Sequence, residues 1–242
     1  MSGQKNKKLA IFDIDGTVFR RSLMVELMKE LIYNGVFPKE AKKLVEKEYQ
    51  DWVNRKGSYQ RYIDKVVVVF MEMLTGCKPA DIVVAGVKVV NYFRDRRYVY
   101  ACDLLEELRD EYFILSISGS PVEIVNEYNK YLKFDKMIGT VFELDEDGKY
   151  TGKMALNAAR EKEKVLNKFL RANNFDLKGS IGIGDTEYDS VFLEKVERAI
   201  AFNPNGNLVK IAEEKGWEIV IEKKDIICEI KNGKAKISKY NF

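Results

Sequence analysis

Three short apolar segments, each followed at once by small or acidic residues, constrain the fold of this chain most strongly. They are Leu9–Phe12, Phe113–Ile117 and Ile181–Gly184. Such runs are typical of parallel strands that are buried on both faces. Helical patterns lie between the later runs, from Val122 to Leu132 after Pro121 and from Glu163 to Leu170. The alternation predicts an α/β fold with a doubly wound, Rossmann-like parallel sheet.

The stretch between the first two strands has a different pattern. Its apolar residues follow a helical period, as at Ala41, Val45, Tyr49 and Trp52, and Ser58 and Pro79 can each begin a further helix. We therefore expect a discontinuous core, residues 1–20 and 101–242, with an all-helical cap inserted at 21–100. Two β-hairpins are also expected, around Asp147-Gly148 and around Asn232-Gly233.

The composition excludes some kinds of active site and gives no support to some kinds of partner. The chain has no histidine, which excludes Ser-His-Asp and Cys-His catalysis and any histidine-ligated metal site. Its net charge of +3 among 79 charged residues gives no reason to expect nucleic acid or a membrane surface as partner.

Compartment is inferred from the cysteines and the apolar runs. The three cysteines lie far apart, which indicates reduced thiols, and no apolar run reaches the length of a membrane span or a secretory leader. We expect a cytoplasmic protein that is a monomer or a homodimer.

Two carboxylates end the first strand. Asp13 and Asp15 are two residues apart, so their side chains can point the same way, and Gly16 lets the chain turn away. Ligands of open α/β sheets bind at this edge. Taken alone, the motif fits an ordinary turn equally well. A calcium loop is excluded, because the positions after Gly16 lack the alternating oxygen ligands that such a loop requires.

The second and third strands lead to further polar groups. Ser118-Gly119-Ser120-Pro121 offers hydroxyls and backbone N–H groups at a helix start, which suits an anion, although plain helix capping explains the same residues. Gly184-Asp185-Thr186 and Asp189 bring two more carboxylates, a donor set that favours magnesium beside phosphate. A lysine lies between these two segments, in Glu161-Lys162-Glu163-Lys164, where spacing alone does not separate Lys162 from Lys164.

In combination these motifs resemble the haloacid dehalogenase superfamily. Its four motifs match Asp13-Ile14-Asp15-Gly16-Thr17, Ser118, Lys164, and Gly184-Asp185 with Asp189. The helical insert, the Asp-Gly hairpin and Phe202-Asn203-Pro204 are similar to the phosphoserine-phosphatase-like subclass, which has a helical cap over a Rossmann-like core. The resemblance selects Lys164 over Lys162.

The resemblance also implies an activity, that of a magnesium-dependent phosphatase acting on a small phosphate monoester. Asp13 would be the nucleophile that forms an aspartyl phosphate, and Asp15 the general acid and base. Ser118, Gly119 and Lys164 would bind the phosphoryl group. The metal would be held by Asp13, the backbone carbonyl of Asp15 and Asp185, with Asp189 orienting the ligands.

Substrate identity is less constrained. Phosphoserine phosphatases are similar but carry a glutamate nine residues past the nucleophile, where this chain has Ser22. Arg20 and Arg21 beside it suggest a more anionic or differently shaped leaving group, while Glu26 is a possible substitute for the missing carboxylate. Phosphoserine hydrolysis and a phosphotransferase or mutase reaction using the same aspartyl phosphate are the alternatives.

Overall fold

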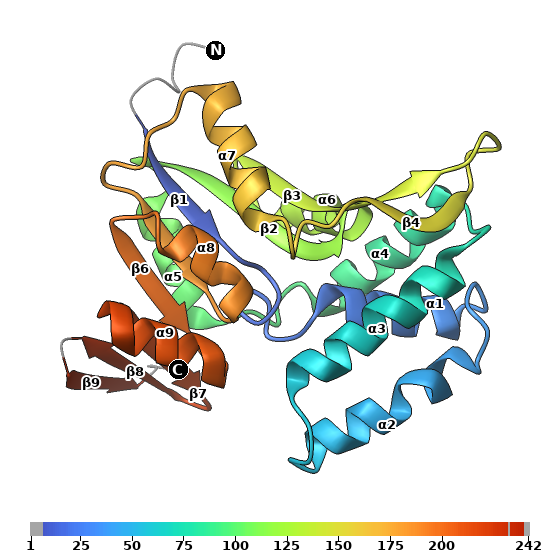
Figure 1. Ribbon diagram of the computed structural model, residues 1–242, viewed down its shortest axis with the longest axis horizontal. Helices are drawn as coiled ribbons and strands as arrows, with labels where there is room; N and C mark the ends of the chain where they lie inside the picture. The colour runs from blue at the N-terminus through green and yellow to red at the C-terminus, as the bar shows by residue number, and fades with distance from the viewer. Residues whose placement is uncertain (1–6, 232, 240–242) are drawn as a thin grey trace.

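The computed structural model describes residues 7–231 and 233–239. Its central feature is a sheet whose strands follow the order β4-β3-β2-β1-β5-β6-β7-β8-β9 among the described residues (Figure 1). The strands are β1 (Lys8–Phe12), β2 (Tyr112–Pro121), β3 (Lys136–Leu144), β4 (Tyr150–Leu156), β5 (Ile181–Gly184), β6 (Arg198–Phe202), β7 (Glu218–Lys223), β8 (Ile226–Lys231) and β9 (Lys234–Lys239). The run from β3 to β7 through β2, β1, β5 and β6 is parallel, and the outer pairings are antiparallel.

Helices cover both faces of the sheet, which confirms the doubly wound prediction. Alternate residues of β1 face opposite layers: Phe12 packs with α5 (Val99–Leu108) and α6 (Val122–Leu132), and Ile11 packs with the helices on the other face. The helices on that second face are α7 (Lys162–Asn173), α8 (Ser190–Leu193) and α9 (Gly206–Lys215), with the short 3₁₀ turn η1 (Glu187–Asp189) before α8.

The segment between β1 and β2 is helical, as its periodicity predicts. It contains α1 (Leu23–Tyr33), α2 (Ala41–Val53), α3 (Tyr59–Leu74) and α4 (Pro79–Phe93). Ser58 caps α3 by accepting a hydrogen bond from the backbone N–H of Arg61, and Pro79 is the first residue of α4. The Val66–Phe70 run lies inside α3, so helical length outweighs its β-branched composition. The exact domain limits of the cap remain a prediction.

Both predicted hairpins are present as paired strands. β3 and β4 are antiparallel around the Asp147-Gly148 turn, and Phe142 of β3 packs against Phe70 of α3, with ring centroids 5.7 Å apart. β8 and β9 form the second hairpin, although its expected turn residue Asn232 lies outside the described residues. Rather than standing apart, this hairpin extends the main sheet through β7. No helix in residues 7–231 or 233–239 is long and apolar enough to cross a membrane.

We predict that Gly139→Ala destabilises the core. A Cβ at Gly139 in β3 would lie 2.8 Å from Val122 Cα and 2.9 Å from the carbonyl oxygen of Ser120. Both contacts are with backbone, so relief requires β3 to move away from the β2–α6 junction. Such overpacking costs about 1–3 kcal/mol. The measurement is the free energy of unfolding from a denaturant titration.

Gly206→Ala is the matched control, because a Cβ there meets no atom within 4 Å. Its effect should stay within about 0.5 kcal/mol. Equal stability of the two variants would contradict the tight packing of β3 on this junction.

Candidate active site

The carboxyl ends of three neighbouring strands build the site. β1 pairs with β2 on one side and β5 on the other, so the residues that follow these strands meet at one edge of the sheet. The backbone N–H of Asp13 donates to the carbonyl of Ile183 at 3.0 Å, which continues the β1–β5 pairing to Asp13. Asp13, Asp185 and Asp189 are therefore brought together, as the sequence predicts, and Asp15 follows at the same edge.

Lys162 provides the cation at the centre of the site. Its Nζ lies 2.6 Å from Asp13 Oδ1 and also donates to Asp189 Oδ1, and all three side chains are buried. The two carboxylates raise the pKa of Lys162 above its usual value despite burial, so the ammonium form persists at neutral pH.

The choice of Lys164 for this position is wrong. The Lys164 side chain is 77% exposed and its Nζ pairs with Glu161 Oε2 at 2.6 Å, outside the site. The helix phase is the physical reason. Lys162 is three and four residues before the buried Val165 and Leu166 and therefore shares their face, whereas Lys164 points to solvent.

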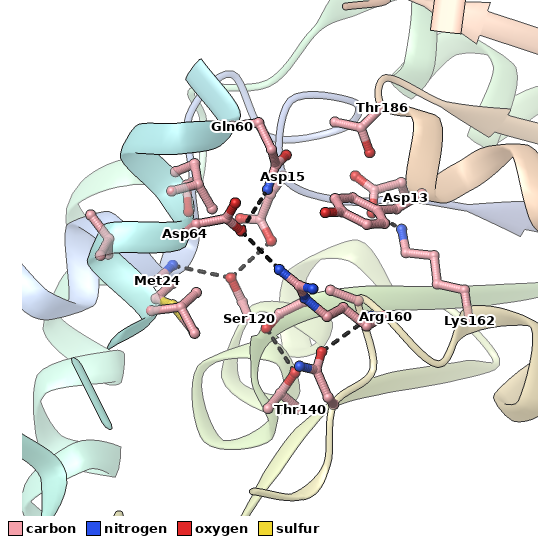
Figure 2. Close-up of a pocket in the computed structure, with 18 of the residues that line it drawn as sticks. Asp13, Asp15, Met24, Gln60, Asp64, Ser120, Thr140, Arg160, Lys162 and Thr186 are labelled. Carbon is pink, nitrogen blue, oxygen red and sulfur yellow. Dashed lines mark hydrogen bonds and ion pairs between the residues drawn. The ribbon is translucent and has the colours of Figure 1, made fainter. Parts of the chain in front are cut away.

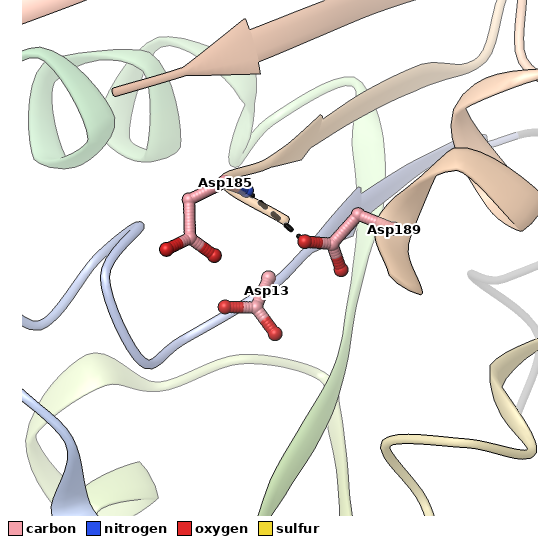
Figure 3. Close-up of side chains that lie close together, drawn as sticks. All are labelled: Asp13, Asp185 and Asp189. Atoms are coloured by element: carbon pink, nitrogen blue, oxygen red, sulfur yellow. Dashed lines mark hydrogen bonds between the residues drawn. The ribbon is translucent and has the colours of Figure 1, made fainter. Parts of the chain in front are cut away.

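Three carboxylates form a compact cluster beside this lysine. Oxygens of Asp13, Asp185 and Asp189 lie within 4.8 Å of one another (Figure 3). Asp189 Oδ2 accepts hydrogen bonds from the backbone N–H of Asp185 at 3.0 Å and of Thr186 at 2.9 Å, which fixes the loop. A Cβ on Gly16 would lie 2.1 Å from Asp185 Oδ2, so glycine is needed where the loop after β1 passes this carboxylate.

The cluster has the composition of a magnesium site. Three carboxylates, two buried and one half-buried, face one ammonium, so the group lacks compensating positive charge. Burial and the neighbouring carboxylates raise the pKa of Asp13 to about 8 and raise that of Asp185 as well. A divalent cation with oxygen ligands would supply the missing charge. The residues present therefore fit Mg²⁺.

Asp15 is held apart from the cluster. Its Oδ2 accepts hydrogen bonds from Ser118 Oγ at 2.9 Å and Ser120 Oγ at 2.8 Å, and its Oδ1 accepts one from the backbone N–H of Leu23 at 2.5 Å. Burial raises its pKa, while these three donors favour the ionised form. The expected metal contact of Asp15 is through its backbone carbonyl, and the side chain is turned toward the serines.

The predicted anion-binding segment differs in detail from the expectation. β2 continues to Pro121, so Ser118 and Gly119 belong to an irregular strand end and not to a helix start. The Ser118 hydroxyl is directed to Asp15, and the Gly119 carbonyl accepts a hydrogen bond from Thr140 Oγ1 at 2.8 Å. Ser120, to which the sequence assigns no separate role, also donates to Asp15 and is 2% exposed.

A cavity of about 230 Å³ opens over these groups (Figure 2). Asp13, Asp15, Gly119 and Lys162 line its inner part. Tyr59, Gln60 and Asp64 of α3 cover it from the cap, and Arg160, on the loop before α7, lies 3.4 Å from Asp64 across the cavity. Sequence reasoning missed these cap and loop residues, because nothing in a local pattern shows which face of α3 meets the core.

Of the two further residues predicted to bind substrate, Ser22 lines the cavity and Arg20 lies outside it. Ser22 is buried and caps α1, where its Oγ accepts from the backbone N–H of Val25 at 3.4 Å, and it also lines the cavity. Arg20 is exposed, and its guanidinium lies 5.5 Å from the ring centroid of Tyr98 at the outer side of the site.

Comparison with known proteins places this site in a family. Residues 10–194 match the model of the haloacid dehalogenase-like hydrolases. The phosphoserine phosphatase of Methanocaldococcus jannaschii is 24% identical over 92% of this chain and 96% of its own. The inhibition of morphological differentiation protein of Streptomyces azureus is also 24% identical, over 91% of this chain and 82% of its own.

Solved structures show the same fold. A phospho-aspartyl intermediate analogue of phosphoserine phosphatase superposes with a TM-score of 0.58 and 24% identity, covering 91% of this chain and 96% of that one. The family match spans both the end of β1 and the loop after β5, where the acidic cluster is formed. The resemblance inferred from the motifs is confirmed: the chain belongs to the haloacid dehalogenase-like hydrolases.

Proposed function

We propose that this protein is a magnesium-dependent phosphatase that hydrolyses a small organic phosphate monoester through an aspartyl phosphate on Asp13. The observation that carries the proposal is the buried contact of Asp13 with Lys162 beside the acidic cluster, with Asp15 fixed on the other side. The relative from Methanocaldococcus jannaschii, a phosphoserine phosphatase, supports the reaction class. Phosphate monoesters hydrolyse very slowly in water, so catalysis depends on positioning and on charge.

Asp13 is the group that attacks phosphorus. Lys162 binds Asp13 Oδ1, which orients the carboxylate at the cavity wall and leaves Oδ2 as the attacking oxygen of the proposed reaction. A bond forms between this oxygen and phosphorus while the bond to the leaving oxygen breaks, and water then cleaves the aspartyl phosphate to release inorganic phosphate. The ammonium of Lys162 also offsets the negative charge of the phosphoryl oxygens.

Magnesium would be held by Asp13, Asp185 and the backbone carbonyl of Asp15, with Asp189 orienting the loop through its hydrogen bonds. When bound, the cation supplies positive charge on one side of the phosphoryl group. Gly119 and Ser120 line the cavity where the phosphoryl oxygens would lie, while Ser118 is fully buried and its hydroxyl donates to Asp15.

Asp15 provides the proton for the departing alcohol. Its carboxylate lines the cavity and is half-buried, and desolvation raises its pKa, which is the direction that a general acid needs. In the second step the same carboxylate activates water. A halide leaving group would need no such acid, so the residue favours phosphate ester chemistry over carbon–halogen cleavage.

The cytoplasm is the location we propose. The three cysteines are free thiols, as expected in a reducing compartment.

We predict that Asp13→Asn abolishes turnover, because an amide lacks the charged oxygen that attacks phosphorus. The expected loss is at least about 10³-fold in kcat, measured as phosphate release from p-nitrophenyl phosphate with Mg²⁺. Circular dichroism and the melting temperature control for folding. Activity equal to that of the unaltered protein would rule out Asp13 as the nucleophile.

We predict that Lys162→Gln lowers kcat/KM by at least about 100-fold, since it removes the only ammonium that contacts Asp13 among the described residues. Lys164→Gln is the matched control and should stay within about twofold, because Lys164 is exposed and pairs with Glu161. The result would contradict the assignment if Lys164→Gln were the more damaging change. Lys162→Arg keeps the buried charge and separates loss of folding from loss of catalysis.

We predict that Mg²⁺ stabilises the protein through the acidic cluster and that chelation stops the reaction reversibly. A ligand at about 100 times its Kd stabilises by about 2.7 kcal/mol, which a melting curve detects. Asp185→Asn should lose most of this shift, while Asp147→Asn on the distant β3–β4 turn should retain it. If Mg²⁺ raised the melting temperature of Asp185→Asn as much as that of the unaltered protein, the metal would bind elsewhere.

A further inference from the structure

A wide groove continues outward from the phosphoryl cavity. It has a volume of about 1,100 Å³, and we call it the outer groove. It shares six residues with the cavity: Ser22, Tyr59, Gln60, Asp64, Asp185 and Thr186. Whatever is esterified to the phosphate must therefore lie in or near the outer groove when the phosphoryl group is at Asp13.

Beyond the shared residues, the charged side chains that line the outer groove are mainly cationic. It has five cationic side chains, Arg20, Arg21, Lys29, Arg55 and Arg61, and two anionic ones, Glu26 and Glu187. Both anions already have partners. Glu26 is buried and its Oε1 accepts from Arg21 at 2.9 Å and from Lys29 at 3.0 Å. Glu187 accepts hydrogen bonds from the side-chain amides of Asn205 and Asn207, which lower its pKa.

Three guanidinium groups remain without a carboxylate partner among residues 7–231 and 233–239: those of Arg20, Arg55 and Arg61. Arg20 lies on the core side, where its backbone N–H donates to the carbonyl of Arg96 at 3.0 Å and its side chain lies over Tyr98. Arg55 ends the turn after α2 and Arg61 is in the first turn of α3, so both lie on the cap side. Positive charge therefore faces the groove from both walls.

The groove offers little to a cationic leaving group. The position nine residues past Asp13 is Ser22, whose hydroxyl caps α1. Glu26, the possible substitute, is neutralised by Arg21 and Lys29. Asp64 lies at the entrance but pairs with Arg160 at 3.4 Å and accepts from Gln60 at 3.1 Å. An ammonium group in the groove would therefore meet carboxylates that already have partners, apart from Asp185, which belongs to the acidic cluster.

Aromatic rings on the cap side strengthen the attraction between the guanidinium groups and an anion in the groove. Trp52 and Tyr62 stack with centroids 5.9 Å apart, and Trp52 lies 4.8 Å from the ring of Tyr59. Clefts with walls of low polarity focus the field of nearby charges. An anion between these rings and Arg20 would feel the guanidinium groups more strongly than at an open surface.

We propose that the leaving group of the substrate carries a second acidic group, a carboxylate or a phosphate, which Arg20 binds from the core and Arg61 and Arg55 bind from the cap. The substrate class is then a phosphate monoester of an anionic alcohol. This inference rests on the proposed phosphatase function. It also assigns Arg20 a contact with the leaving group and not with the phosphoryl group.

The first test compares esters that share the reacting phosphate and differ in charge. They are 3-phosphoglycerate and propane-1,3-diol bisphosphate, which are anionic, glycerol 3-phosphate, which is neutral beyond its phosphate, and O-phosphoethanolamine, which is cationic. We expect kcat/KM for the better anionic ester to exceed that for glycerol 3-phosphate by at least about tenfold, with O-phosphoethanolamine lowest. The two anionic esters distinguish a carboxylate site from a phosphate site. Equal values across the series, or a preference for the cationic ester, would overturn the proposal.

The second test assigns the preference to the arginines. Arg61→Gln and Arg20→Gln should each raise KM for the anionic ester and so reduce the ratio of anionic to neutral kcat/KM. Arg171→Gln is the matched control, since Arg171 is exposed on α7 and outside the groove. If Arg171→Gln reduced the ratio as much as Arg61→Gln, net charge and not the groove would explain the preference, and the proposal would fail.

A binding measurement separates this inference from the proposed function. Asp13→Asn should bind 3-phosphoglycerate or propane-1,3-diol bisphosphate more tightly than glycerol 3-phosphate by calorimetry, and a second substitution, Arg61→Gln, should remove the difference. That result would support an anion-selective groove even if the unaltered protein hydrolysed none of the esters, an outcome that would refute the phosphatase proposal alone. Equal binding of charged and neutral esters would overturn the groove assignment whatever the turnover.

Discussion

The contact of the Lys162 ammonium with Asp13 and Asp189 is the interaction on which the site depends. The ends of β1 and β5 bring Asp13, Asp185 and Asp189 into one largely buried cluster, and their mutual repulsion would oppose folding without a cation among them. Removing one partner from such a group leaves uncompensated buried charge. Lys162 is 3% exposed at the first residue of α7, so the helix position and the charge balance of the cluster are set together.

Much of the fold follows from local sequence. The apolar runs, the Pro121 signal and the Asp-Gly turn predict β1, β2, β5, α6 and the β3–β4 hairpin, because strand burial and turn chemistry are determined within a few residues. The same holds for the acidic cluster, since parallel strands bring their carboxyl ends to one edge. The lysine was misassigned, yet the buried face formed by Val165, Leu166 and Phe169 carries the information that separates Lys162 from Lys164.

Other contacts could not be inferred from local patterns. Ser120, like Ser118, donates a hydrogen bond to Asp15, which lies 105 residues before Ser120. Arg160 pairs with Asp64 of α3, which lies 96 residues before it. These contacts depend on how the cap helices lie over the sheet edge. That arrangement is set by packing across the whole interface, as in the contact of Phe70 with Phe142. Periodicity identifies which residues of α3 are apolar, but not which polar ones face the cavity.

The start of α1 links the cap to the chemistry. Backbone N–H groups of Leu23 and Met24, in the first turn of α1, donate to Asp15 Oδ1 and Ser120 Oγ, while Ser22 caps the helix. The positive end of a helix favours a negative charge beside it, so α1 stabilises the ionised form of Asp15 while burial opposes it. In the proposed reaction Asp15 alternates between these two forms. The position of the first cap helix therefore contributes to the proton affinity of Asp15, and in the proposed reaction a displacement of α1 would alter catalysis without moving Asp13.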